Sequence, residues 1–183
     1  MNFKRSLKTK AMCFSMSYII YYFMRGYVNL LLFNLLYKNL IWTITNNLIA
    51  DILIFFIILM IPINMVHEWC HGILLKAFGG QVKYQWKGIY MQAQEVSKVP
   101  IHRTKFLMVL LLPVTVISIF AKLIPGWLGG VVLILNLFKS TEDVLKAFYL
   151  LKGNSDTYLI YKEDGYEMVD NSEEAELTLE NAK

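Results

Sequence analysis

The chain has 183 residues, which suits one domain of ordinary size, and 56% of them are hydrophobic while only 17% are charged. Soluble domains are about a quarter charged, so this composition excludes an ordinary soluble domain and indicates a protein that contacts membrane lipid. Basic residues outnumber acidic residues by 18 to 14, but basic charge beside apolar segments is typical of the cytoplasmic side of membrane proteins, so we expect no nucleic-acid partner.

Residues 1–40 form a basic and apolar N-terminal segment. Residues 12–37 are apolar except at Arg25 and Gly26, which divide them into two short pieces. A single tilted membrane span fits this pattern, and so does an interfacial helix followed by a partial span. The sequence leaves both interpretations open.

The clearest membrane span covers residues 41–65, with the sequence IWTITNNLIADILIFFIILMIPINM. It is long enough for a helix to cross a hydrocarbon core of about 30 Å. We expect the helix to be kinked at Pro62 and to continue through HEWCH to Phe78. The pair Gly79-Gly80 should end it, because glycine is favoured just after a helix.

Residues 82–94 are predicted to form a β-hairpin with Lys87-Gly88 as its two-residue loop. The pairing across this loop places six residues on one face, namely Val82, Tyr84, Trp86, Ile89, Met91 and Ala93. This face suits packing at the membrane interface, and the edge of the hairpin also suits binding of an extended peptide.

The second half of the chain contains another predicted span over residues 106–124 and a further apolar stretch over residues 126–138. The polar sequence KSTED interrupts this stretch before VLKAFYLL resumes the apolar pattern. A strand-turn-strand unit is predicted over residues 153–169. The acidic residues 170–183 are predicted to form a disordered tail.

Together these elements predict an all-α multi-pass membrane protein with about 3–4 transmembrane helices and one or two small β-hairpins at the cytoplasmic face. The membrane core is expected over residues 41–152. Basic residues cluster at the N-terminus and in the loop over residues 76–105, so both are predicted to be cytoplasmic, together with the C-terminal tail. We therefore expect the protein in the cell membrane, with HEWCH near the cytoplasmic end of its helix.

The sequence HEWCH, residues 67–71, places two histidines one helical turn apart on one face. Both imidazoles can then reach one metal ion, and the glutamate lies beside that ion without having to bind it. His67 and His71 are therefore candidate zinc ligands, and Glu68 is the candidate base that activates a zinc-bound water. The alternative is a pair of membrane histidines with Glu68 as their ion-pair partner. Three ionisable residues in a membrane helix are costly unless a partner compensates them, which favours the metal.

A third protein ligand must come from another segment, and the predicted topology brings residues 139–143 to the membrane depth of HEWCH. Asp143 and Glu142 are the candidates there. Asp143 also fits a capping box in which Ser140 opens a helix, so the sequence leaves the ligand and the cap interpretations open. Asp51 lies about four turns before His67 on the same helix, too far away to share its ion.

Several segments resemble a known family. The segment HEWCHGILLKAFGG resembles the HExxHG segment of small bacterial multi-pass membrane proteins, the putative zincin peptidase family. The later segments LLPVTVISIF and NLFKSTEDVLKAFYLLKGNSDTYLIYKEDGYEMV are similar to theirs as well. The resemblance implies Asp143 as the third zinc ligand. The motif is also similar to that of site-2-type intramembrane metalloproteases, whose later Asp is followed by a glycine that TEDV lacks.

These observations predict a zinc-dependent membrane hydrolase, a metallopeptidase that cleaves a peptide or a membrane-protein substrate near the cytoplasmic membrane face. His67, His71 and Asp143 would hold Zn²⁺ and leave one position for water, and Glu68 would be the catalytic base. The alternative is a non-catalytic membrane protein with a structural or sensory metal, whose shell Cys70 or Glu142 would close as a fourth ligand.

Overall fold

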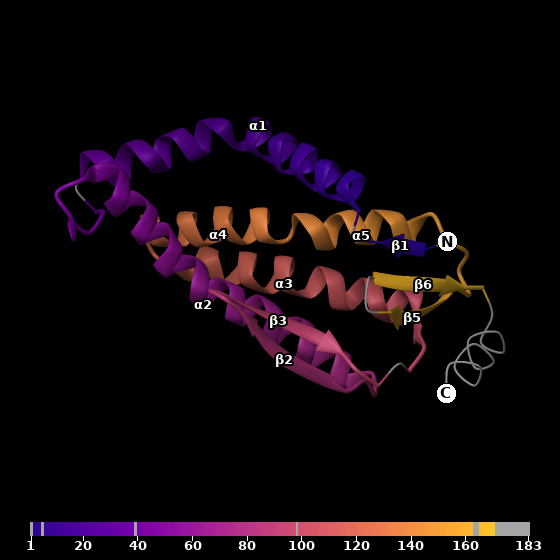
Figure 1. The fold of residues 1–183 in the computed structure, drawn as a ribbon. Helices are drawn as coiled ribbons and strands as arrows, with labels where there is room; N and C mark the ends of the chain where they lie inside the picture. The colour runs from indigo at the N-terminus through magenta and orange to yellow at the C-terminus, as the bar shows by residue number, and fades with distance from the viewer. Residues whose placement is uncertain (1, 5, 39, 98, 163–164, 171–183) are drawn as a thin grey trace.

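The computed structural model describes residues 2–4, 6–38, 40–97, 99–162 and 165–170, so all but the first residue of the predicted acidic tail lies outside it. Three helices are long and apolar enough to cross a membrane: α1 (Leu7–Tyr37), α2 (Leu48–Ala77) and α3 (Arg103–Leu123). A shorter apolar helix, α4 (Trp127–Lys139), is followed in line by α5 (Thr141–Leu151) (Figure 1). With the small antiparallel strand pairs described below, this architecture confirms the predicted fold class.

The N-terminal segment forms one continuous helix, α1, which runs through Arg25 and Gly26 without a break. Ser6 begins it with a capping box, because its side chain accepts the Thr9 N–H and the Thr9 hydroxyl accepts the Ser6 N–H. Most of the α1 side chains are exposed, and the helix packs mainly along α4 and α5 (Figure 1). A helix of this length and composition could cross a membrane, and whether it spans the membrane or lies at the interface stays a prediction.

The helix that carries HEWCH begins at Leu48 and not at residue 41 as predicted. The Asn47 side chain accepts two backbone N–H groups of the first turn and caps the helix there. Asp51 is buried and accepts hydrogen bonds from the preceding turn, including the Thr45 N–H and the Thr45 hydroxyl. These bonds hold residues 41–47 in a turn that cannot also be helical. The predicted end of the helix is confirmed, since α2 ends at Ala77.

The predicted hairpin is confirmed, but its register is shifted. Strand β2 (Val82–Lys87) pairs with β3 (Tyr90–Glu95), and Lys87 lies opposite Tyr90. The prediction of Lys87-Gly88 as the loop was wrong, because the loop is Gly88-Ile89. Gly88 has a φ of +69°, the left-handed conformation that the first position of such a turn requires and that glycine adopts without strain.

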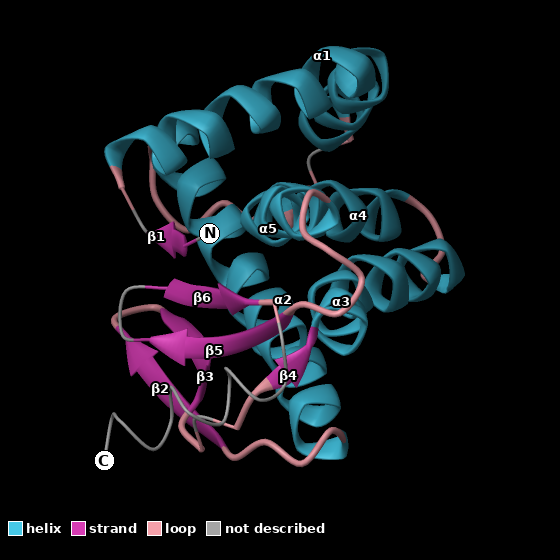
Figure 2. Cartoon of the chain, turned by 90° about the vertical axis from the view of Figure 1, so that its right-hand side faces the viewer, coloured by secondary structure: helices cyan, strands magenta, loops and turns pink. Residues whose placement is uncertain are grey.

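A four-stranded antiparallel sheet gathers distant parts of the chain at one end of the molecule (Figure 2). Its order is β1 (Asn2–Lys4), β6 (Gly165–Val169), β5 (Tyr158–Lys162) and β4 (Ile101–His102). Strands β5 and β6 form the predicted C-terminal hairpin, whereas β1 and β4 were not predicted. The sheet places the N-terminus, the loop before α3 and the C-terminal hairpin on the same side of the helices.

Two clusters of buried apolar residues fix α2 against its neighbours. One lies near the sheet and joins α2, α3, α5 and the strands, with Leu75, Phe106 and Leu150 among its members. The other lies at the far end and joins α1, α2 and α4 through Leu35, Phe55 and Val131. The part of α2 that carries HEWCH is held between these clusters, so its two histidines face α3, α4 and α5 in a defined orientation.

Candidate metal centre

The two histidines of HEWCH lie one turn apart on α2 and point to the same place. Their Nε2 atoms are 3.2 Å apart, and the exposed fractions are 0% for His67 and 9% for His71. Such deep burial of two imidazoles requires partners for all their nitrogen atoms, since an unpaired buried polar group is costly.

Asp143 meets both histidines from α5. Its Oδ2 atom lies 2.9 Å from His67 Nε2 and 3.3 Å from His71 Nε2, while its Oδ1 atom lies 3.6 Å from Lys146 Nζ. The capping interpretation was wrong. Ser140 has a right-handed helical conformation and makes no side-chain capping bond, because the chain passes from α4 into α5 with almost no break. The Asp143 carboxylate is turned toward the histidines instead.

The other ring nitrogen of each histidine faces an oxygen acceptor. His71 Nδ1 lies 2.8 Å from the backbone carbonyl of Val109 in α3, and His67 Nδ1 lies 3.3 Å from Asn136 Oδ1 in α4. A carbonyl can only accept, so His71 Nδ1 carries a proton and donates it to Val109, while Nε2 is directed toward Asp143. Hydrogen bonds of this kind orient the histidine ligands of protein metal sites.

Glu68 lies beside this group but does not belong to it. Its Oε1 atom forms an ion pair of 3.0 Å with Lys139 Nζ at the end of α4, and its Oε2 atom accepts the Ala93 N–H of β3 at 2.8 Å. Glu68 is only 7% exposed. The carboxylate is therefore fixed from two sides and lies close to the histidines without binding at the same point.

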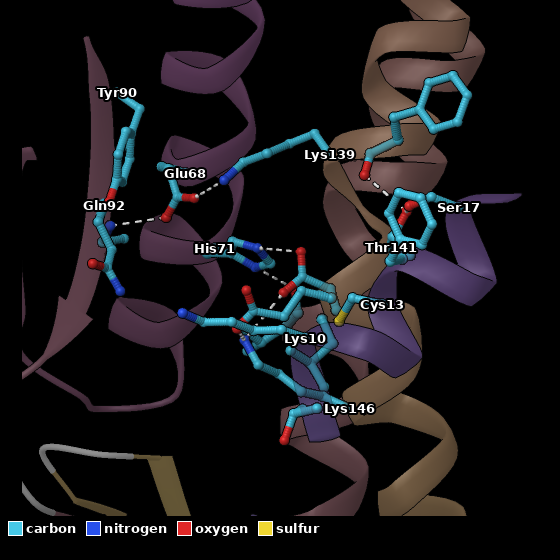
Figure 3. A pocket seen from close by; sticks show the side chains of 18 of the residues that line it. Lys10, Cys13, Ser17, Glu68, His71, Tyr90, Gln92, Lys139, Thr141 and Lys146 are labelled. Atoms are coloured by element: carbon cyan, nitrogen blue, oxygen red, sulfur yellow. Dashed lines mark hydrogen bonds and ion pairs between the residues drawn. The ribbon is translucent and has the colours of Figure 1, made fainter. Parts of the chain in front are cut away.

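A cavity of about 810 Å³ opens onto both His71 and Glu68 (Figure 3). Its walls come from helices α1 to α5 and from strands β3 and β5, with Lys10 and Cys13 of α1 opposite His71. Burial, reinforced by the charges of Glu95 and Asp143, raises the pKa of Tyr161 well above its ordinary value. Tyr161 therefore presents a neutral phenol to the cavity near neutral pH.

A family model described as "Putative zincin peptidase" matches residues 57–158, more than half of the chain. The chain belongs to this family. The matched segment begins inside α2, ends at the start of β5 and contains His67, Glu68, His71 and Asp143. No curated protein and no solved structure matches the chain.

The donor set of this zincin peptidase family member fits zinc. Zinc prefers imidazole nitrogen and carboxylate oxygen at about 2.0–2.2 Å in a tetrahedron, so neighbouring ligand atoms should be about 3.3 Å apart. The three separations among the Nε2 atoms and Asp143 Oδ2 are 2.9, 3.2 and 3.3 Å. Three such atoms at these separations could hold one metal ion.

The structure separates the other candidate residues from this group. Glu142 forms an ion pair of 2.9 Å with Lys146, and Cys70 is a buried free thiol. Within the described ranges, the group of potential metal ligands consists of His67, His71 and Asp143 alone. A fourth protein ligand, which the non-catalytic alternative predicts, is therefore not among the described side chains.

Three contributors to the site were missed in the sequence. Asn136 is fully buried although it is polar and lies in an apolar helix, and this combination is a signal that could have been used. Lys139 was counted only as one basic residue of a polar insert. Val109 contributes through its backbone carbonyl, so the type of side chain at this position does not reveal its role.

Proposed function

We propose that the chain is a zinc-dependent membrane metallopeptidase that cleaves a peptide or a membrane-protein substrate near the cytoplasmic membrane face. One observation carries this function: His67 Nε2, His71 Nε2 and Asp143 Oδ2 meet at a single buried point. Both Nδ1 atoms face oxygen acceptors, so the two Nε2 atoms and the Asp143 oxygen are the atoms available to bind a cation at that point. A cation at that point stabilises all three. Zinc, when bound, supplies a Lewis acid that acidifies a water and polarises the scissile carbonyl.

Glu68 is the proposed proton carrier. It accepts a proton from the attacking water and returns it to the leaving amine, a role that requires a carboxylate at the wall of the substrate cavity. The ion pair with Lys139 and the Ala93 N–H hold Glu68 at that wall. These contacts orient the carboxylate before substrate arrives.

The shape of the cavity supports a peptide as substrate. Strand β3 lines it with Tyr90, Gln92 and Ala93, so a peptide bound in the cavity between this strand and α1 would pass Glu68. The wall on the α1 side includes Phe14, which suits an apolar side chain. The exposed apolar surfaces of α1, α2 and α3 would contact lipid.

The proposed orientation has the N-terminus, the sheet and the C-terminus in the cytoplasm. The sheet joins β1, β4, β5 and β6 on one side of the helices. The helices that follow β1 and β4 begin with basic residues, Lys8 and Lys10 in α1 and Arg103 and Lys105 in α3, which fits the positive-inside rule. Reporter fusions at the two ends of the chain should both give a cytoplasmic signal. A signal from outside the membrane at either end would contradict this orientation.

The substitution Glu68→Gln tests the function. Gln has the same size and can still accept the Ala93 N–H, but it cannot carry the proton, so cleavage should fall by about 10²–10⁴-fold while the protein keeps its zinc. The measurement uses detergent-solubilised protein and a library of synthetic membrane-spanning peptides with polar tails, with new termini detected by mass spectrometry. Zinc is measured in the same samples.

Glu167→Gln in β6 is the matched control, because this residue lies outside the cavity wall and should leave both cleavage and zinc unchanged. A Glu68→Gln protein that cleaves as the wild type does would remove Glu68 from the mechanism. A wild-type protein that keeps zinc and cleaves no peptide of the library would favour the non-catalytic alternative.

A further inference from the structure

A proline interrupts α3 beside the metal centre. Pro113 lies inside the helix and is fully buried. Proline has no backbone N–H, so it cannot bond to the carbonyl four residues earlier in a helix. That carbonyl belongs to Val109, which is 1% exposed and therefore has little access to solvent. The sequence thus creates a buried carbonyl that needs a donor from another element.

His71 supplies this donor, and the contact is one of two that fix the orientation of the histidine rings. His71 Nδ1 donates to the Val109 carbonyl at 2.8 Å. The buried imidazole needs an acceptor for its proton and the buried carbonyl needs a donor, so each satisfies the other. An alanine at position 113 would supply a second N–H to this oxygen, which would draw the carbonyl toward the helix axis and weaken the bond to His71.

The carbonyl of Pro113 itself provides the second contact. It accepts a hydrogen bond from Asn136 Nδ2, with 3.5 Å between the nitrogen and the oxygen. This bond turns the amide nitrogen toward α3, so Asn136 Oδ1 faces His67. His67 Nδ1 lies 3.3 Å from that oxygen. Because a carbonyl cannot donate, this chain of contacts selects the amide orientation of Asn136 and then the tautomer of His67.

We propose that Pro113 is a positioning residue for both histidines of the metal centre. Its missing N–H leaves the Val109 carbonyl to His71, and its own carbonyl orients Asn136 toward His67. The missing N–H thus acts on His71 and the backbone carbonyl at the same position acts on His67 through Asn136, so one position of α3 directs both Nε2 atoms at the shared point. This inference rests on the proposed function only in assigning that point to zinc; the orientation of the rings is a property of the metal-free protein.

The substitution Pro113→Ala distinguishes positioning from packing, because the two roles predict different results. Proline is the least favourable residue in a helix interior, so replacing it should not lower the helical content or the melting temperature of the metal-free protein. Loss of the contacts that orient metal-ligating histidines typically weakens metal binding by about 10–100-fold. We expect that loss in the affinity for zinc alone, measured by competition with a chelator in detergent.

A second readout needs no zinc. The chain has 3 histidines, so the Nδ1–H signals of His67 and His71 can be followed by NMR of metal-free protein labelled with ¹⁵N only in histidine. Both protons should be protected from exchange with solvent in the wild type. In Pro113→Ala the His71 proton should exchange faster, because the helix N–H now draws the Val109 carbonyl toward the helix axis.

Pro62→Ala is the matched control. Pro62 also lies inside a membrane helix but is exposed, and the carbonyl that it leaves free belongs to Ile58, which contacts neither histidine. Zinc affinity and both ring signals should stay at wild-type values.

Unchanged ring signals and zinc affinity in Pro113→Ala would overturn the proposal. A Pro113→Ala protein that fails to fold would overturn it as well, because Pro113 would then act by packing. A wild-type protein with protected ring protons but no zinc affinity would contradict the proposed function and leave the positioning role supported.

Discussion

At the scale of single residues, the parts of the site that follow from local spacing could be predicted and the long-range contacts could not. His67 and His71 share a helical face because they are four residues apart. Asp143 lies 76 residues after His67. The sequence around it fits a metal ligand and a helix cap equally well. Only the conformation of Ser140 excludes the cap, and that conformation depends on α4 continuing into α5.

The supporting contacts were hidden for a related reason. Asn136 and the Val109 carbonyl act through atoms that face other helices, and a linear pattern does not reveal which helices are neighbours. Pro113 is the exception, because a proline inside an apolar span always leaves one carbonyl without its helical donor. The sequence indicates the free carbonyl, whereas its partner, His71, is known only from the packing of α2 against α3.

At the scale of elements, the long apolar helices and the C-terminal hairpin were predictable because each has enough residues to form a pattern. Strands β1 and β4 have 3 and 2 residues, which is too short for alternation to be recognised. Their pairing is set by the sheet as a whole. The hairpin register depends on whether Gly88, which has a positive φ, is the first or the second residue of the turn. Both registers place the same strand residues on one face, so the alternation of side chains does not distinguish them.

Helix α2 and strand β3 are joined by a match of spacing. Asn64 Oδ1 accepts the Met91 N–H at 2.6 Å, and Glu68 Oε2 accepts the Ala93 N–H at 2.8 Å. Residues four apart on a helix are separated by about 6 Å along its axis, and residues two apart on a strand by about 6.7 Å. Two consecutive outward N–H groups of β3 are therefore both bonded to α2, and Glu68 is held by the same arrangement.

The substitution Asn64→Leu tests this junction. It leaves the buried Met91 N–H without an acceptor, at a cost of about 1–3 kcal/mol, so hydrogen exchange at this amide should accelerate by about 5–100-fold. Zinc content should not change, because Asn64 is not among the candidate ligands. Asn34→Leu in α1 is the control, since the Asn34 side chain bonds only to the carbonyl of Leu30. Unchanged exchange at Met91 in Asn64→Leu would mean that the hairpin is held by other contacts.

At the scale of the whole molecule, the site forms where separate parts of the chain meet. The family match begins at residue 57, yet Lys10, Cys13 and Phe14 of α1 form one wall of the cavity. Helix α2 brings the histidines and Glu68, α3 and α4 bring the acceptors that orient them, and α5 brings Asp143. The two apolar clusters hold these elements in place, so the position of the site depends on the complete bundle.

The zinc content of the purified protein tests the three-ligand centre most directly. We expect about one zinc per wild-type chain by elemental analysis and a large loss in each of His67→Ala, His71→Ala and Asp143→Ala, because two remaining ligands bind zinc weakly. Asp51→Asn and His102→Ala are matched controls, since Asp51 holds the turn before α2 and His102 caps α3, and both should keep the metal. An Asp143→Ala protein that holds as much zinc as the wild type, or a wild-type protein without zinc, would contradict the proposed centre.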